Sequence, residues 1–162
     1  MTLDVDITKD PSALTLTVAA RFDASVERTW QLLADPRQLE RWWGPPSYPA
    51  TVVDHDLTPG GAVSYFMTSP EGVKHHGYWR IVAVDAPYRL EHEDGFADDS
   101  GQPNPEMPYC VMRTTLEADG GGTRMTIVTT YPSAEAMERM VAMGMVEGLT
   151  QAVQQIPAVL AA

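Results

Sequence analysis

Four histidines and one cysteine are the side chains of this sequence best suited to metal binding or nucleophilic chemistry. His55, His92 and the adjacent pair His75 and His76 lie in segments of strand-like composition. Neighbouring strand residues point to opposite faces of a sheet, so at most one histidine of the pair can face a given cavity. No His-x-His or His-Glu-x-x-His spacing occurs, and a metal site would have to assemble across strands. We therefore expect no metal.

Acid–base chemistry needs a carboxyl or imidazole group inside an apolar cavity, where burial shifts its pKa. The candidates for this role are Glu91, His92, His76 and Arg113. Cys110 lies in a strand-like run, which is typical of a small buried side chain rather than a nucleophile. The sequence has no Gly-x-Ser-x-Gly motif, no phosphate-binding glycine loop and no dinucleotide fingerprint. We assign no catalytic residue and no cofactor. A binding role is the first hypothesis, and an enzyme is kept as the alternative.

The charge and composition exclude several kinds of partner. The 162 residues include 11 Lys and Arg against 22 Asp and Glu, a net charge of −11. Such a field repels phosphate backbones and anionic lipid surfaces, so we expect no nucleic-acid partner. No stretch approaches about 18 uninterrupted apolar residues, and we expect no membrane insertion. A single cysteine, and a start without a basic segment followed by an apolar run, favour a cytoplasmic protein.

The elements that would position these residues follow from the periodicity of apolar side chains. A strand is predicted over residues 14–22, followed by a short helix over 26–34 with Ser25 as its N-cap. Asp35 and Pro36 begin a second short helix, which Gly44 and the two following prolines end. A period of two then predicts strands near residues 50–57, 62–68, 73–84, 88–95, 108–118 and 123–131.

The last predicted element is a long helix from Ser133 to about Ile156, apolar on one face. Consecutive strands joined by short turns form one antiparallel sheet, and only this helix is long enough to cover it. Gly144 and Gly148 cost about 1 kcal/mol each relative to Ala, which close approach to the sheet or room for a ligand would explain. We expect an α+β fold with about seven strands, as a single domain over residues 14–160 after an N-terminal extension of residues 1–13.

Two segments have alternative interpretations. The connection over residues 96–108 is long for a compact domain, and it is either a lid over a cavity mouth or a loose solvated loop. Trp42 and Trp43 either pack under the rim of the sheet or form part of an interface, since large aromatic side chains are common in interfaces.

Four stretches of this sequence resemble one known family. They are Arg21–Trp30, Asp35–Pro45, the set Asp56–Gly61, Gly77–Trp79 and Ala86–Leu90, and the pair Gly122–Thr126 and Gly144–Leu149. Their order and spacing resemble the START-like helix-grip superfamily (SRPBCC), and within it the family named after the activator of heat-shock-protein-90 ATPase. The resemblance implies a curved sheet around a long C-terminal helix with an apolar cavity between them. It implies function only loosely, because members include lipid carriers, receptors, polyketide aromatase/cyclases and chaperone cofactors.

We expect a non-catalytic protein that binds a small apolar or aromatic ligand, because pockets in such folds are apolar with a few polar groups. The expected ligand-binding residues are Trp43, His55, Tyr65, Met67, His76, Trp79, His92, Met112, Ile127, Met140, Met143 and Gly144. One alternative is a polyketide cyclase-like or aromatase-like enzyme that uses polar cavity residues. The other is a chaperone-associated or homodimeric interaction module. The resemblance implies that chaperone activation usually comes with an additional chaperone-binding domain, for which we expect this chain to be too short.

Overall fold

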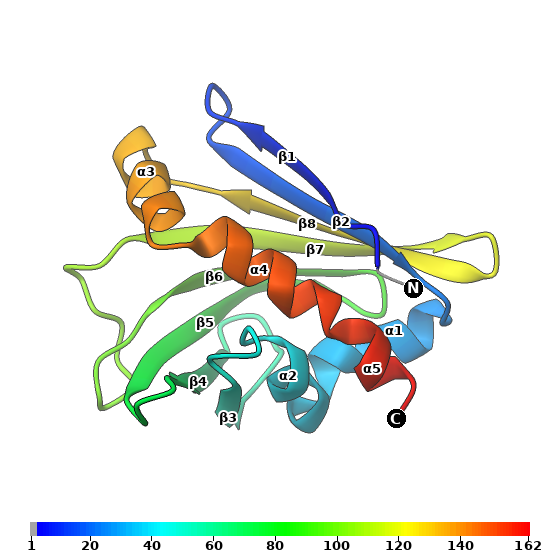
Figure 1. Cartoon of the computed structure of the whole chain (residues 1–162), viewed down its shortest axis with the longest axis horizontal. Helices are drawn as coiled ribbons and strands as arrows, with labels where there is room; N and C mark the ends of the chain where they lie inside the picture. Colours follow the sequence, from blue (N-terminus) through cyan, green and yellow to red (C-terminus); the bar gives the residue numbers. More distant parts are fainter. Residues whose placement is uncertain (1–2) are drawn as a thin grey trace.

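The computed structural model describes residues 3–162, which form one eight-stranded antiparallel sheet and five helices (Figure 1). The strands are β1 (Asp6–Asp10), β2 (Thr15–Phe22), β3 (Ala50–His55), β4 (Ala62–Thr68), β5 (Lys74–Asp85), β6 (Arg89–Phe96), β7 (Tyr109–Asp119) and β8 (Gly122–Thr130). Their spatial order is β1-β2-β8-β7-β6-β5-β4-β3. The predicted run of six antiparallel strands after the short helices is confirmed, because every consecutive pair from β3 to β8 is joined by antiparallel pairing.

The sheet has eight strands where about seven were predicted, because β1 lies in the segment expected to precede the domain. The side chains of β1 are all exposed, so the strand has no alternation of buried and exposed residues that the sequence could reveal. Its turn into β2 is closed by Asp10, whose Oδ1 accepts hydrogen bonds from the backbone N–H groups of Ser12 and Ala13. Local turn chemistry and edge pairing therefore form this strand without core packing.

The two short helices form where the caps predicted them. Ser25 caps α1 (Val26–Ala34) by accepting from the N–H of Arg28, and Asp35 caps α2 (Pro36–Trp42) by accepting from the N–H of Arg37. These side chains satisfy N–H groups that have no partner inside the first helical turn. The caps therefore fix where both helices begin.

The long C-terminal helix predicted from residue 133 to about 156 is wrong in one respect, since the segment is divided into three helices. They are α3 (Ala134–Ala142), α4 (Met145–Gln154) and α5 (Ile156–Leu160). The first break is at Gly144, whose φ of +90° is a left-handed conformation that glycine adopts without steric cost. Pro157 lies in the first turn of α5, where its missing N–H needs no partner. The apolar spacing continues through the break at Gly144, because α3 and α4 each bury one face.

The helices cover the concave side of the sheet, with α4 lying across it and α5 ending beside α1 and α2 (Figure 1). Trp42 is fully buried there, and its indole N–H donates to the carbonyl of Leu32 at 2.9 Å. At the end of α4, the side-chain amide of Gln155 donates to the carbonyls of Trp42 (3.3 Å) and Gly44 (2.6 Å). Trp42 and Trp43 are both buried, so they do not form an exposed aromatic surface.

Within residues 3–162, none of the helices combines the length and the apolarity that crossing a membrane requires.

Candidate ligand pocket

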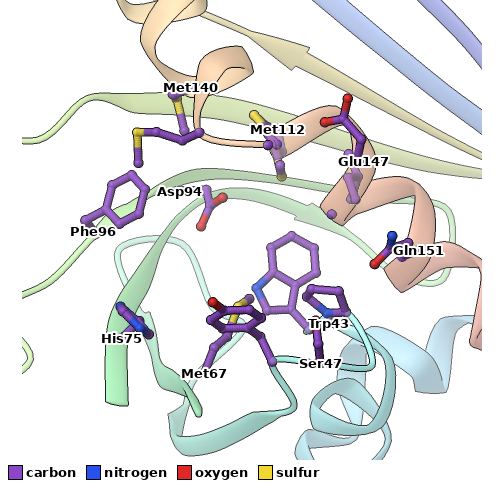
Figure 2. A pocket seen from close by; sticks show the side chains of 17 residues that line it. Trp43, Ser47, Met67, His75, Asp94, Phe96, Met112, Met140, Glu147 and Gln151 are labelled. Atoms are coloured by element: carbon purple, nitrogen blue, oxygen red, sulfur yellow. The ribbon is translucent and has the colours of Figure 1, made fainter. Parts of the chain in front are cut away.

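A pocket of about 520 Å³ lies between the concave face of the sheet and the C-terminal helices (Figure 2). Its walls come from strands β4 to β7, from the segment 43–48 that follows α2, and from the junction between α3 and α4. The lining residues are Trp43, Pro45, Ser47, Tyr48, Met67, His75, Asp94, Phe96, Met112, Met140, Met143, Gly144, Met145, Glu147, Gly148, Leu149 and Gln151. Most are apolar, and the volume is within the range of pockets that hold small organic ligands.

The strand register determines which side chains reach this pocket. Asp94 and Phe96 are two residues apart on β6 and therefore share its concave face. Tyr65 on β4 lies opposite Gly77 on β5, and a Cβ added to Gly77 would approach the Tyr65 ring to 2.5 Å. The tyrosine ring thus occupies the space left by the missing side chain, and its hydroxyl is directed toward β6. A glycine within the sheet is needed here for close packing rather than for backbone flexibility.

Asp94 and Tyr65 form a buried polar pair at the inner end of the pocket. The Tyr65 hydroxyl donates to Oδ1 of Asp94 at 3.0 Å, and both side chains are buried. Burial raises the pKa of Asp94 from 3.8 to about 7, while the hydrogen bond from Tyr65 acts in the opposite direction. Burial and the Asp94 charge raise the pKa of Tyr65 well above its ordinary value. Near neutral pH the carboxyl group therefore changes its charge beside a hydroxyl that stays protonated.

Tyr65→Phe is expected to raise the pKa of Asp94 by about one unit. A hydrogen bond to a charged group contributes roughly 1.5–3 kcal/mol, and one pKa unit corresponds to about 1.4 kcal/mol. Carboxyl-carbon NMR titration of the wild type and the variant measures this shift. The matched control is Tyr78→Phe, because Tyr78 donates at 2.6 Å to Glu93 instead and pairs across from Gly95. An equal shift in both variants, or none in Tyr65→Phe, would contradict the assignment.

Behind the pocket wall, aromatic rings form a buried layer. The His92 ring stacks on Trp79 with centroids 3.9 Å apart, and Trp43 packs edge-on against Trp79 at 4.9 Å. Burial lowers the pKa of His92 to about 3, so its imidazole is neutral at neutral pH. The ring nitrogens of Trp43 and Trp79 are buried without a hydrogen-bond partner among residues 3–162. Trp79 and His92 therefore pack behind Trp43, which is the ring of this layer that lines the pocket.

Six of the twelve residues expected to bind ligand line this pocket, namely Trp43, Met67, Met112, Met140, Met143 and Gly144. The other six do not line it. Trp79, His92 and Ile127 are buried in the core, and Tyr65 is buried beside Asp94. His55 contacts the carbonyl of Leu33 at 2.9 Å through Nε2. A ligand-binding role stays a prediction for all twelve.

Of the adjacent histidines on β5, His75 lines the pocket, whereas His76 lies on the other face and is 3.9 Å from Asp99. The expectation that only one of the two could face the cavity is confirmed, but the residue chosen for it was His76, whereas the structure places His75 there. The same parity shows how Asp94 and Phe96 could have been found. They lie two and four residues after His92, which was among the expected ligand-binding residues. The segment 45–48 has no comparable periodic signal.

The other candidates for chemistry lie apart from the pocket. Glu91 and Arg113 form an ion pair at 2.9 Å on the opposite face of the sheet from Asp94. Cys110 is a buried free thiol whose pKa is raised by burial, and its Sγ is 3.7 Å from the carbonyl oxygen of Asp94. A protonated, enclosed thiol is a packing residue rather than a nucleophile. Within residues 3–162 no group of three or more His, Cys, Asp or Glu side chains is arranged to hold a metal ion.

The loop over residues 97–108 does not line the pocket. Its first half is organised by Asp98, whose Oδ1 accepts from the N–H groups of Ser100 and Gln102 and from the Ser100 hydroxyl. Ala97 also pairs with Pro103 as an isolated bridge. The loop is therefore locally ordered by its own turn, and in this structure it is not a cover over the pocket.

A sheet curved around C-terminal helices, with an apolar pocket between the two, defines a helix-grip protein. The chain belongs to the family described as activator of Hsp90 ATPase homolog 1-like protein, whose profile matches residues 23–161. This result confirms the resemblance carried by the four sequence stretches.

Solved structures extend the comparison. Protein Ms6760 from Mycobacterium smegmatis is 53% identical over 97% of both chains, with a TM-score of 0.89. A protein from Arthrobacter aurescens is 47% identical over 96% of this chain and 91% of its own, with a TM-score of 0.92. CalU16 from Micromonospora echinospora is 16% identical over 99% of this chain and 87% of its own, with a TM-score of 0.59, which shows the fold alone. No curated protein matches the chain.

Proposed function

We propose that this protein binds a small apolar or aromatic molecule in the pocket between the sheet and α4. The observation that carries the proposal is the pocket of about 520 Å³ with five methionines and three aromatic rings in its lining. Methionine is flexible and polarizable, so its side chains adapt to ligands of varied shape. Aromatic rings add apolar area and edge-to-face contacts.

The glycines of the C-terminal segment support the same proposal. A Cβ added at Gly144 or Gly148 would meet no atom within 4 Å, so neither glycine is required for close approach of the helix to the sheet. Gly144 is explained by its left-handed backbone. Gly148 lies within α4, lines the pocket and has no such backbone requirement. Its missing side chain leaves space that a ligand would fill.

Gly148→Leu is expected to weaken ligand binding at least about tenfold without destabilising the protein, because leucine favours helix over glycine by roughly 1 kcal/mol. The probe is N-phenylnaphthylamine, an uncharged aromatic molecule whose fluorescence reports an apolar site. A bound probe at about a hundred times its Kd should also stabilise the fold by roughly 2.7 kcal/mol, seen as a higher Tm.

The matched control for this experiment is Gln154→Leu, because Gln154 is an exposed residue of the same helix that does not line the pocket. This control should retain the affinity of the wild type. Equal probe binding by both variants, or no probe binding by the wild type, would overturn the proposed function.

A second candidate function, an enzyme acting on a ligand held in this pocket, is favoured by the Asp94–Tyr65 pair. A carboxyl group with a pKa of about 7 is matched to proton transfer at neutral pH. Mass spectrometry of a ligand recovered after incubation distinguishes the two functions, since a binding protein returns it unchanged.

The cytoplasmic location and the homodimeric state remain proposals. The location is supported by the single cysteine, which is buried as a free thiol. Size-exclusion chromatography with light scattering measures the oligomeric state, and a strict monomer would exclude the homodimer.

A further inference from the structure

The charged groups at the pocket have one sign. The acidic side chains that line it are Asp94 at the inner end and Glu147 on α4, and no Lys or Arg of residues 3–162 lines it. Figure 2 shows Asp94 on the sheet beside the space that Trp43 lines, whereas the Glu147 carboxylate on α4 points away from both residues. An anionic ligand, such as a fatty acid, would find two carboxylates and no basic side chain except the imidazole of His75.

Asp94 has an unused hydrogen-bond acceptor. Its Oδ1 accepts from the Tyr65 hydroxyl, whereas Oδ2 accepts no hydrogen bond from residues 3–162. Asp94 is only 9% exposed, and it lines the pocket. A buried carboxylate is strongly destabilised unless donors surround it. A ligand donor placed in the pocket would therefore complete its hydrogen bonding.

Aromatic rings lie around the same space. Trp43, Tyr48 and Phe96 line the pocket together with Asp94. The faces of such rings carry partial negative charge and attract ammonium groups, most strongly where water is excluded. The lining thus combines an unpaired acceptor, aromatic rings and a net negative charge.

We propose that the ligand is an apolar or aromatic amine, whose ammonium group donates to Oδ2 of Asp94 while its apolar part lies among the methionines and aromatic rings. This inference rests on the proposed function and adds the chemical class of the ligand to it. A hydrogen bond between ionised partners is roughly twice as strong as one between neutral groups, so an amine should bind more tightly than the matching alcohol.

Protonation of Asp94 opposes this mode of binding. The titratable groups around its carboxyl group are Tyr65 on β4, Cys110 on β7, His92 on β6, His75 on β5 and Glu147 on α4. Tyr65 and Cys110 are neutral at neutral pH because burial raises the pKa of each. Binding of an ammonium group should therefore hold Asp94 ionised, and the affinity for an amine should fall as the pH is lowered below about 7.

The test compares naphthylethylamine, naphthylethanol and naphthylpropionate, which share the apolar ring system and differ in the charge of the end group. In the wild type the amine is expected to bind about 10- to 100-fold more tightly than the alcohol, and the carboxylate most weakly. Asp94→Asn should remove the preference for the amine. The matched control, Glu138→Gln, removes the same charge from an exposed position of α3 that does not line the pocket, and it should retain that preference.

The outcomes separate this inference from the proposed function. If the alcohol binds as tightly as the amine, the amine class is wrong and the apolar pocket stands. If none of the three compounds binds, the proposed function itself fails. A wild-type pH series covers the case in which Asp94→Asn does not fold, because the ratio of amine to alcohol affinity must fall between pH 8 and pH 5. A constant ratio would overturn the role of Asp94.

Discussion

The free energy of unfolding of Asp94→Asn, measured relative to that of the wild type, is expected to rise by about 2–4 kcal/mol between pH 4 and pH 8. The pKa of Asp94 is raised from 3.8 to about 7, a shift of about three units at about 1.4 kcal/mol each. Between these pH values the native state binds more protons than the unfolded state. The contribution of Asp94 to the free energy of unfolding of the wild type therefore falls as the pH rises through this window, and it stays low above pH 7.

The asparagine variant does not titrate, yet its side-chain oxygen still accepts the hydrogen bond from Tyr65. Urea unfolding at a series of pH values measures the difference between variant and wild type. The control is Asp98→Asn, because hydrogen bonds from Ser100 lower the pKa of Asp98 below its ordinary 3.8, so the stability difference between this variant and the wild type should be nearly constant between pH 4 and pH 8. A pH-independent difference for Asp94→Asn would show that its carboxyl group is not destabilised by burial.

The second large effect concerns His92, whose own contribution to stability should be lost in acid. Burial lowers its pKa from 6.5 to about 3, so the unfolded state binds a proton that the native state excludes. The stability contributed by neutral His92 is fully present above pH 6.5 and is lost as the pH falls toward 3. From pH 7.5 to pH 4, His92→Phe should gain about 2–3 kcal/mol relative to the wild type. Phenylalanine retains a ring to stack on Trp79.

His92 and Asp94 have opposite effects on stability between about pH 4 and pH 6.5. The native state excludes a proton from His92 that the unfolded state binds, and it keeps a proton on Asp94 that the unfolded state has lost. The wild type should vary little in this range, and each single variant should reveal the slope of the remaining group. The double variant is the control, and its stability should be nearly constant with pH. If the stability of His92→Phe varied with pH as little as that of the wild type, His92 would not be the group that offsets Asp94.

The burial of Asp94 also bears on the proposed ligand-binding role. A carboxyl group enclosed by apolar side chains lowers stability at neutral pH, and a hydrophobic residue of similar size would avoid that loss. The position is a natural one for a hydrogen bond to a ligand, because Asp94 lines the pocket and Tyr65 fixes one of its oxygens. A stability measurement and a binding measurement on the same variant would therefore report on the same carboxyl group.

Local features of the sequence were sufficient for much of the fold. Ser25 and Asp35 cap the two short helices because each side chain bonds a backbone group two or three residues away, which needs no tertiary context. The alternating strands after residue 50 and their short turns determined the antiparallel order, because adjacent strands with short connections pair with each other. Four of the five methionines that line the pocket, Met67, Met112, Met140 and Met143, were among the expected ligand-binding residues.

Other features depended on the tertiary structure. The strand β1 forms by edge pairing without burial, and the break at Gly144 leaves the apolar spacing of α3 and α4 unchanged, so neither has a periodic signature. The face taken by His75 depends on strand register, and bulges near Val52 and Ile81 alter that register locally. The sequence by itself specifies which side chains alternate and where helices start. Only packing decides which face of the strand is enclosed, and with it the burial that gives Asp94 its raised pKa.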